Sequence, residues 1–184
     1  MEQQTTNTIL IEMDDKSWDF FSDNGAKWLD NLLLVQSSYR KLLDDTAEKV
    51  TELHIKAYLT DMHERAKQHE QKIEELYKIL NRDSSAIRKT LGTVLGKAQQ
   101  VLGDVMAFTG GVAGPWQDLQ QLYLANTNTM GAFGIAEQIG LAMGVPEITD
   151  IAVPIEMDLA TDHLILQELV LEMAGVAIMY NQSF

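Results

Sequence analysis

The sequence contains no cysteine in its 184 residues. This absence excludes disulfide bonds, thiolate zinc sites and a cysteine nucleophile. No uninterrupted apolar run reaches the roughly 18 residues that a membrane-spanning helix needs. The N-terminal stretch MEQQTTNTILIEMDD also lacks the basic start and apolar core of a signal peptide. We therefore expect a cytoplasmic protein that does not associate with membranes.

Basic residues are missing from nearly half of the chain. All 14 Lys and Arg lie in residues 1–97 with 17 acids, whereas residues 98–184 hold 10 acids and no base. The net charge of −13 repels phosphate backbones, so we expect no nucleic-acid partner. Three explanations of the acidic half stay open: solubility, a patch that collects cations, or a face that is buried in an oligomer.

Common catalytic motifs are absent, and no segment alternates as a strand does. There is no P-loop, no Gly-x-Gly-x-x-Gly and no nucleophile elbow. Residues 53–80 instead repeat apolar residues at steps of four and three, which is typical of one face of a helix. The members of this stripe are Ile55, Leu59, Met62, Ala66, His69, Ile73, Leu76 and Leu80.

Four more helices are predicted around this one, making the chain all-α. We expect a partly ordered arm over residues 1–25 and a helical domain over 26–184, with helices at 26–50, 53–80, 86–108, 115–143 and from 146 to about 179. Pro115 suits a first helical turn and Gly144 a helix stop, whereas Pro154 should interrupt or kink the last helix. This order predicts a four-helix bundle with a long crossover that carries an extra helix.

One strongly polar residue interrupts the apolar stripe of each predicted bundle helix. These residues are Tyr39, His69, Asn126 and Asp162, and we expect them to form one polar cluster in the interior. A hydrogen-bonded network would satisfy them, because buried polar groups need partners. Two alternatives stay open: a mononuclear metal site of His69, Asp158 and Asp162, or a different register of the helices.

Three stretches carry a resemblance to a known family. They are HERAKQHEQKIEELYKIL, LYLANTNTMGAFGIAEQIGLAMGV and EMDLATDHLILQEL. With them, residues 26–178 resemble the ferritin-like superfamily, and within it the bacterial stress-associated YciF/YciE-type branch. The resemblance implies a helical bundle, frequent dimers and often a di-iron or di-manganese centre.

The metal-binding pattern of that family is degenerate in this sequence. The family's Glu-x-x-His does not occur, since the residues three before the four histidines are Thr51, Thr60, Ala66 and Ala160. Tyr39 stands where the family tends to show Glu, and residues 126–129 stand where it shows Glu-His-x-Glu. The acidic pair remains as Asp158 and Asp162, and a histidine remains as His69.

The missing motif favours a protein that has lost di-iron chemistry. We expect a stress-associated structural or binding protein, a homodimer with no catalytic residue and no cofactor. The alternative is a metal-dependent oxidoreductase that uses Fe or Mn at an atypical site. A helical module that binds another protein is a third hypothesis, based on the apolar end of the last helix.

Overall fold

The computed structural model describes residues 14–89 and 114–180, and every regular element within them is helical. The four long helices are α1 (Asp15–Lys49), α2 (Leu53–Ile79), α4 (Pro115–Met143) and α5 (Pro146–Tyr180). A short helical stretch covers residues 85–89. The all-α prediction is confirmed, while most of the helix predicted at 86–108 lies outside the described residues.

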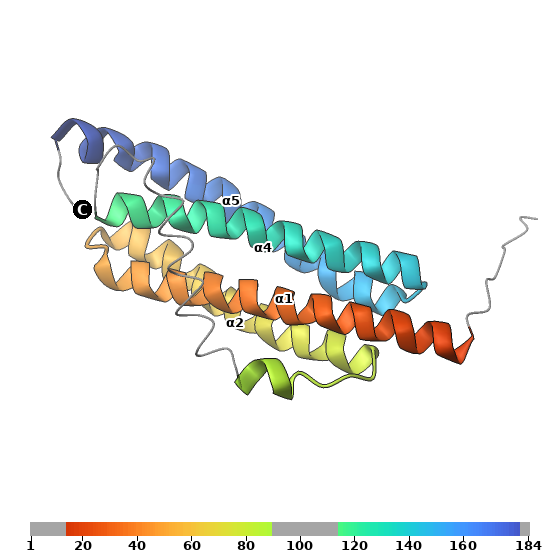
Figure 1. Cartoon of the computed structure of the whole chain (residues 1–184). Helices are drawn as coiled ribbons and strands as arrows, with labels where there is room; N and C mark the ends of the chain where they lie inside the picture. The colour runs from red at the N-terminus through yellow and green to blue at the C-terminus, as the bar shows by residue number, and fades with distance from the viewer. Residues whose placement is uncertain (1–13, 90–113, 181–184) are drawn as a thin grey trace, which may run out of the picture.

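The four long helices pack side by side along their lengths (Figure 1). Short links join α1 to α2 and α4 to α5, and α1 lies against α4 while α2 lies against α5. α2 and α4 run in the same direction, so the end of α2 and the start of α4 lie at opposite ends of the four packed helices (Figure 1). Within the described ranges, no helix has the length and apolar content needed to cross a membrane.

The start of α1 differs from the prediction. The helix begins at Asp15, and the Asp14 carboxylate accepts a hydrogen bond of 2.7 Å from the Ser17 backbone N–H. The first helix therefore begins before residue 26, its predicted start, and includes residues 15–25. Gly25 sits inside α1, where an added Cβ would lie 3.0 Å from Leu80, so close packing explains a residue that local propensity disfavours.

The other helix ends follow their local sequence signals. After α2, Asn81 adopts a left-handed φ of 53°, and the Arg82 N–H donates to the Tyr77 carbonyl at 2.9 Å. Pro115 begins α4 and Gly144, with φ of 67°, ends it, as predicted. Pro154 lies within α5, which continues through it without interruption.

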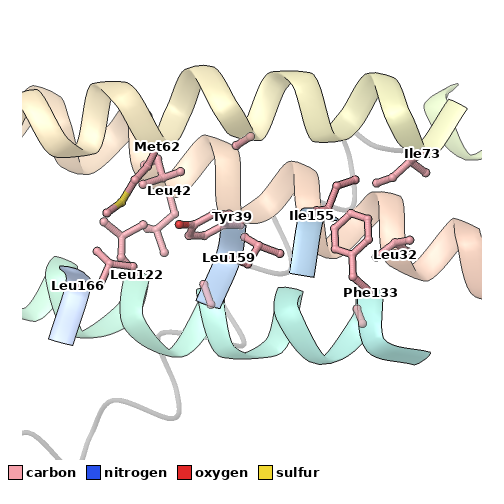
Figure 2. Packing of buried hydrophobic residues seen from close by; sticks show 14 of the residues in the cluster. Leu32, Tyr39, Leu42, Met62, Ile73, Leu122, Phe133, Ile155, Leu159 and Leu166 are labelled. Atoms are coloured by element: carbon pink, nitrogen blue, oxygen red, sulfur yellow. The ribbon is translucent and has the colours of Figure 1, made fainter. Parts of the chain in front are cut away.

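The apolar stripes of the four helices meet in one core. Figure 2 shows Leu32, Tyr39 and Leu42 of α1 packed with residues of the other helices. All eight members of the stripe predicted for residues 53–80 are buried, which confirms that prediction. His69 and other polar residues therefore lie inside the core, where each needs a partner.

Two glycines of α4 provide a matched test of this packing. A Cβ on Gly140 would lie 2.9 Å from Ile148 Cβ, whereas a Cβ on Gly131 would meet nothing within 4 Å. Gly140→Ala should destabilise the fold by about 1–3 kcal/mol through overpacking. Gly131→Ala should stabilise it by about 0.5–1 kcal/mol, because alanine favours the helix. Urea unfolding measures both, and equal effects would contradict the packing of α4 on α5.

Candidate functional site

The predicted polar residues all lie in the interior, one on each long helix. Tyr39, His69, Asn126 and Asp162 are buried, with exposed fractions of 4% or less. They lie near the middle of their helices, so the unpaired backbone groups of the helix ends are not within their reach. The partners of each side chain decide what the cluster can do.

Tyr39 and Asn126 join α1 to α4. The Asn126 side-chain N–H group donates to the Tyr39 hydroxyl at 3.4 Å and to the Leu159 carbonyl at 3.1 Å. Burial raises the pKa of Tyr39 well above its usual range, and the nearby Asp162 carboxylate raises it further. Tyr39 is therefore a neutral hydroxyl at physiological pH and not a ready anionic ligand.

Asp162 pairs with Arg65, which lies outside the predicted apolar stripe of α2. Arg65 of α2 donates from Nη2 to Asp162 Oδ1 at 2.5 Å, and its Nη1 contacts Asp61 one turn earlier. The Asp162 side chain is buried while that of Arg65 is 29% exposed, so the guanidinium reaches in from the rim. Burial raises the pKa of Asp162, and the hydrogen bond from Arg65 opposes that rise.

His69 lies one turn further along α2 and pairs with Asp158 of α5. Its Nε2 is 3.3 Å from Asp158 Oδ2, and its ring meets the Phe133 ring edge-on with centroids 6.3 Å apart. Burial lowers the pKa of His69, while Asp158 opposes this shift. The buried imidazole is therefore held closer to its neutral form than a free histidine would be.

Two side-chain contacts, one helical turn apart, thus link α2 to α5: Arg65 with Asp162, and His69 with Asp158. His69 thus has Asp158 and not Asp162 as its carboxylate partner. The helices are antiparallel, so a step of four residues forward on α2 matches a step of four backward on α5. Arg65 takes the more deeply buried carboxylate because its long side chain carries a permanent charge.

Two further polar contacts link α1 to α2. The Gln36 amide donates to the Ala66 carbonyl at 3.0 Å, and the Tyr77 hydroxyl donates to Asp30 at 2.6 Å. Gln36 could have been found from sequence, because it lies three residues before Tyr39 on the same helix face. Arg65 could have been found as the residue one turn before His69.

The metal hypothesis requires donors that converge on one point. His69, Asp158 and Asp162 were the predicted ligands, but Asp162 is bound to Arg65 while His69 faces Asp158. Among the described residues, no three His, Asp or Glu side chains are grouped so that they could hold a metal ion. The donor set in this arrangement does not fit the di-metal centre that the family resemblance implies.

Comparisons of the chain with models of known protein families, with curated proteins and with solved structures give no match. The ferritin-like resemblance therefore stays a prediction.

The Arg65–Asp162 pair can be tested with substitutions at both carboxylates that touch Arg65. Asp162→Ala leaves the inward-facing guanidinium without its buried partner and should cost about 1–3 kcal/mol. Asp162→Asn keeps the shape and an acceptor oxygen, so it should cost less. The control Asp61→Ala removes an exposed partner and should cost at most about 1 kcal/mol. Urea unfolding measures all three; an Asp61 effect as large as that of Asp162→Ala would contradict this geometry.

The lowered pKa of His69 predicts a pH dependence of stability. The folded state favours the neutral imidazole, so its contribution is present above the unfolded pKa of about 6.5 and is lost as pH falls through the lower folded value. His69→Gln should flatten the decline in unfolding free energy between neutral and mildly acidic pH. Asp158→Asn removes the group that opposes the shift and should steepen it. Parallel slopes in both variants would refute this prediction.

Proposed function

We propose that this chain is a ferritin-like four-helix bundle whose crossover carries an extra helix and which has lost di-iron chemistry. It acts as a cytoplasmic, stress-associated structural or binding protein of bacteria and assembles as a homodimer. The parallel directions of α2 and α4 support a crossover, because α2 ends at the opposite end of the bundle from the start of α4 (Figure 1). The sequence stretches that resemble the family support the rest.

The observation that carries the loss of metal chemistry is the contact between Arg65 and Asp162. A guanidinium stays protonated at all physiological pH values, so it brings a permanent positive charge beside the buried carboxylate. That charge already compensates Asp162, and it repels any second cation placed next to it. In this chain a side chain supplies the positive charge that a metal would otherwise bring to the bundle interior.

The neighbouring residues support the same proposal. Tyr39 is held neutral by burial, and the Asn126 amide is used in hydrogen bonds to Tyr39 and Leu159. Neutral groups of this kind stabilise a packed core more readily than they hold two divalent ions. The cluster therefore favours a structural network that ties the four helices together.

One observation favours the alternative, an Fe- or Mn-dependent oxidoreductase with an atypical site. His69 and Asp158 face each other across α2 and α5, and Nδ1 of His69 has no hydrogen-bond partner among the described residues. An imidazole and a carboxylate are suitable ligands for both metals. Two ligands leave most of a coordination sphere to other groups, so we rank this function second.

Metal analysis of protein purified without chelators separates the two functions. We expect no stoichiometric Fe or Mn and no change in Tm when either divalent ion is added. A specific site would behave differently, because a ligand at 100 times its Kd stabilises the folded state by about 2.7 kcal/mol. Stoichiometric metal that His69→Ala and Asp158→Ala both remove would overturn the structural proposal in favour of the oxidoreductase.

A further inference from the structure

Three buried side-chain atoms in the bundle interior lack a hydrogen-bond partner within residues 14–89 and 114–180. They are Gln36 Oε1 on α1, His69 Nδ1 on α2 and Asn126 Oδ1 on α4, called here the acceptor site. Their side chains belong to residues that are at most 4% exposed, so bulk water does not reach them. A buried polar atom without a partner destabilises a fold, so these three atoms call for a bound group that satisfies them.

Hydrogen bonds of the same side chains place Gln36 and His69 at one level of the bundle. The Gln36 amide donates to the Ala66 carbonyl at 3.0 Å, and Ala66 lies less than one helical turn before His69. His69 in turn extends to α5, where its Nε2 is 3.3 Å from Asp158 Oδ2. This level therefore crosses α1, α2 and α5.

Asn126 reaches the same level from α4. Its amide donates at 3.1 Å to the carbonyl of Leu159, the residue that follows Asp158. It also donates to the hydroxyl of Tyr39, which lies three residues after Gln36 on the same face of α1. The three side chains of the acceptor site therefore lie in one cross-section of the four helices.

Small side chains leave room in this cross-section. Ala66 is the one small residue in the buried stripe of α2, and the buried Ala125 and Thr129 lie beside it on α4. Large side chains, including Met62 and Phe133, fill the core on either side of this level (Figure 2). A polar space between apolar layers is typical of the sites that hold buried water in proteins.

All three atoms of the acceptor site require a hydrogen-bond donor. The oxygens of Gln36 and Asn126 belong to amides whose N–H groups are already used, and an amide oxygen can only accept. A carboxylate also only accepts, so the His69 nitrogen that faces Asp158 carries the proton. In the neutral imidazole, Nδ1 then has a lone pair and accepts as well. The ligand of this site is therefore a small donor of hydrogen bonds.

We infer that the acceptor site binds a pair of hydrogen-bonded water molecules that connects α1, α2 and α4. Two waters have four hydrogens, of which one joins the waters to each other and three remain for the three acceptors. The Tyr39 hydroxyl, which accepts from Asn126, can donate its own hydrogen to one of the waters. Each water thereby gains the two to four polar partners that a buried water needs.

The inference rests on the proposed function and deepens it, because a metal bound to His69 would occupy the same space. An ammonium ion is the other small donor of similar size. Arg65, one helical turn before His69, points its guanidinium inward to Asp162 and would repel a cation at this level. A neutral water does not meet this repulsion, so the charge of the interior favours water.

Oxygen-17 magnetic relaxation dispersion tests the inference, because its amplitude counts buried waters that exchange slowly. Gln36→Met and Asn126→Leu replace an acceptor with an apolar side chain of similar size. Each should lower the amplitude by at least the contribution of one water. The control Met62→Leu changes a buried apolar residue of the same core and should leave the amplitude unchanged. Amplitudes equal to that of the wild type in both acceptor variants would overturn the inference.

Nitrogen-15 NMR of the imidazole rings tests the donor assignment in the unmodified protein. We expect His69 to carry its proton on Nε2, with Nδ1 accepting a hydrogen bond. His54, whose side chain is about half exposed, provides a reference ring in contact with solvent. A proton on Nδ1 of neutral His69 would make this atom a donor and would overturn the water pair described here.

The outcomes separate this inference from the proposed function. A protein that holds no metal and whose acceptor variants lose no water would overturn only the inference. Stoichiometric metal at His69 would overturn both. A Tm raised by ammonium chloride and not by sodium chloride would identify an ammonium ion as the ligand, which overturns the water pair and leaves the loss of di-iron chemistry intact.

Discussion

The buried carboxylate of Asp162 is the constraint on which the arrangement of the helices depends. A carboxylate removed from water costs several kcal/mol unless a charged partner compensates it, and Arg65 of α2 supplies that partner. α2 and α5 belong to different helical hairpins, so this contact fixes the position of one hairpin relative to the other along the helix axes. The second contact, between His69 and Asp158, has the same register and strengthens it.

The polar interior exchanges some stability for a defined structure. Apolar residues at these positions would avoid the cost of desolvation, and buried ion pairs are often no more stable than their apolar replacements. Tyr39, Asn126 and the two α2–α5 contacts instead demand specific partners across all four helices. The surrounding core of large apolar side chains supplies the burial that offsets this cost (Figure 2).

The outside of α5 reverses the usual distribution of polarity. Its inner face holds the buried Asp162, while its outer face carries four exposed large apolar side chains: Met157, Leu164, Leu171 and Ile178. The interior cluster thus holds the helices in one arrangement, whereas the outer face of α5 leaves large apolar side chains exposed.

The sequence by itself determined the features that depend on neighbours along the chain. Helix ends depend on the local backbone, so the limits of α4 and the end of α2 could be predicted from Pro115, Gly144 and Asn81. The buried stripe of residues 53–80 could be predicted from its helical spacing. The tertiary structure decided what depends on distant residues. The predicted start of the first helix was residue 26, but packing of Gly25 against Leu80 supports a helix that begins at Asp15. The apolar stripes likewise placed Asp162 and His69 in the interior. Only the relative position of α2 and α5 could pair Asp162 with Arg65 and His69 with Asp158. A shift of one helical turn between these helices would change the partners.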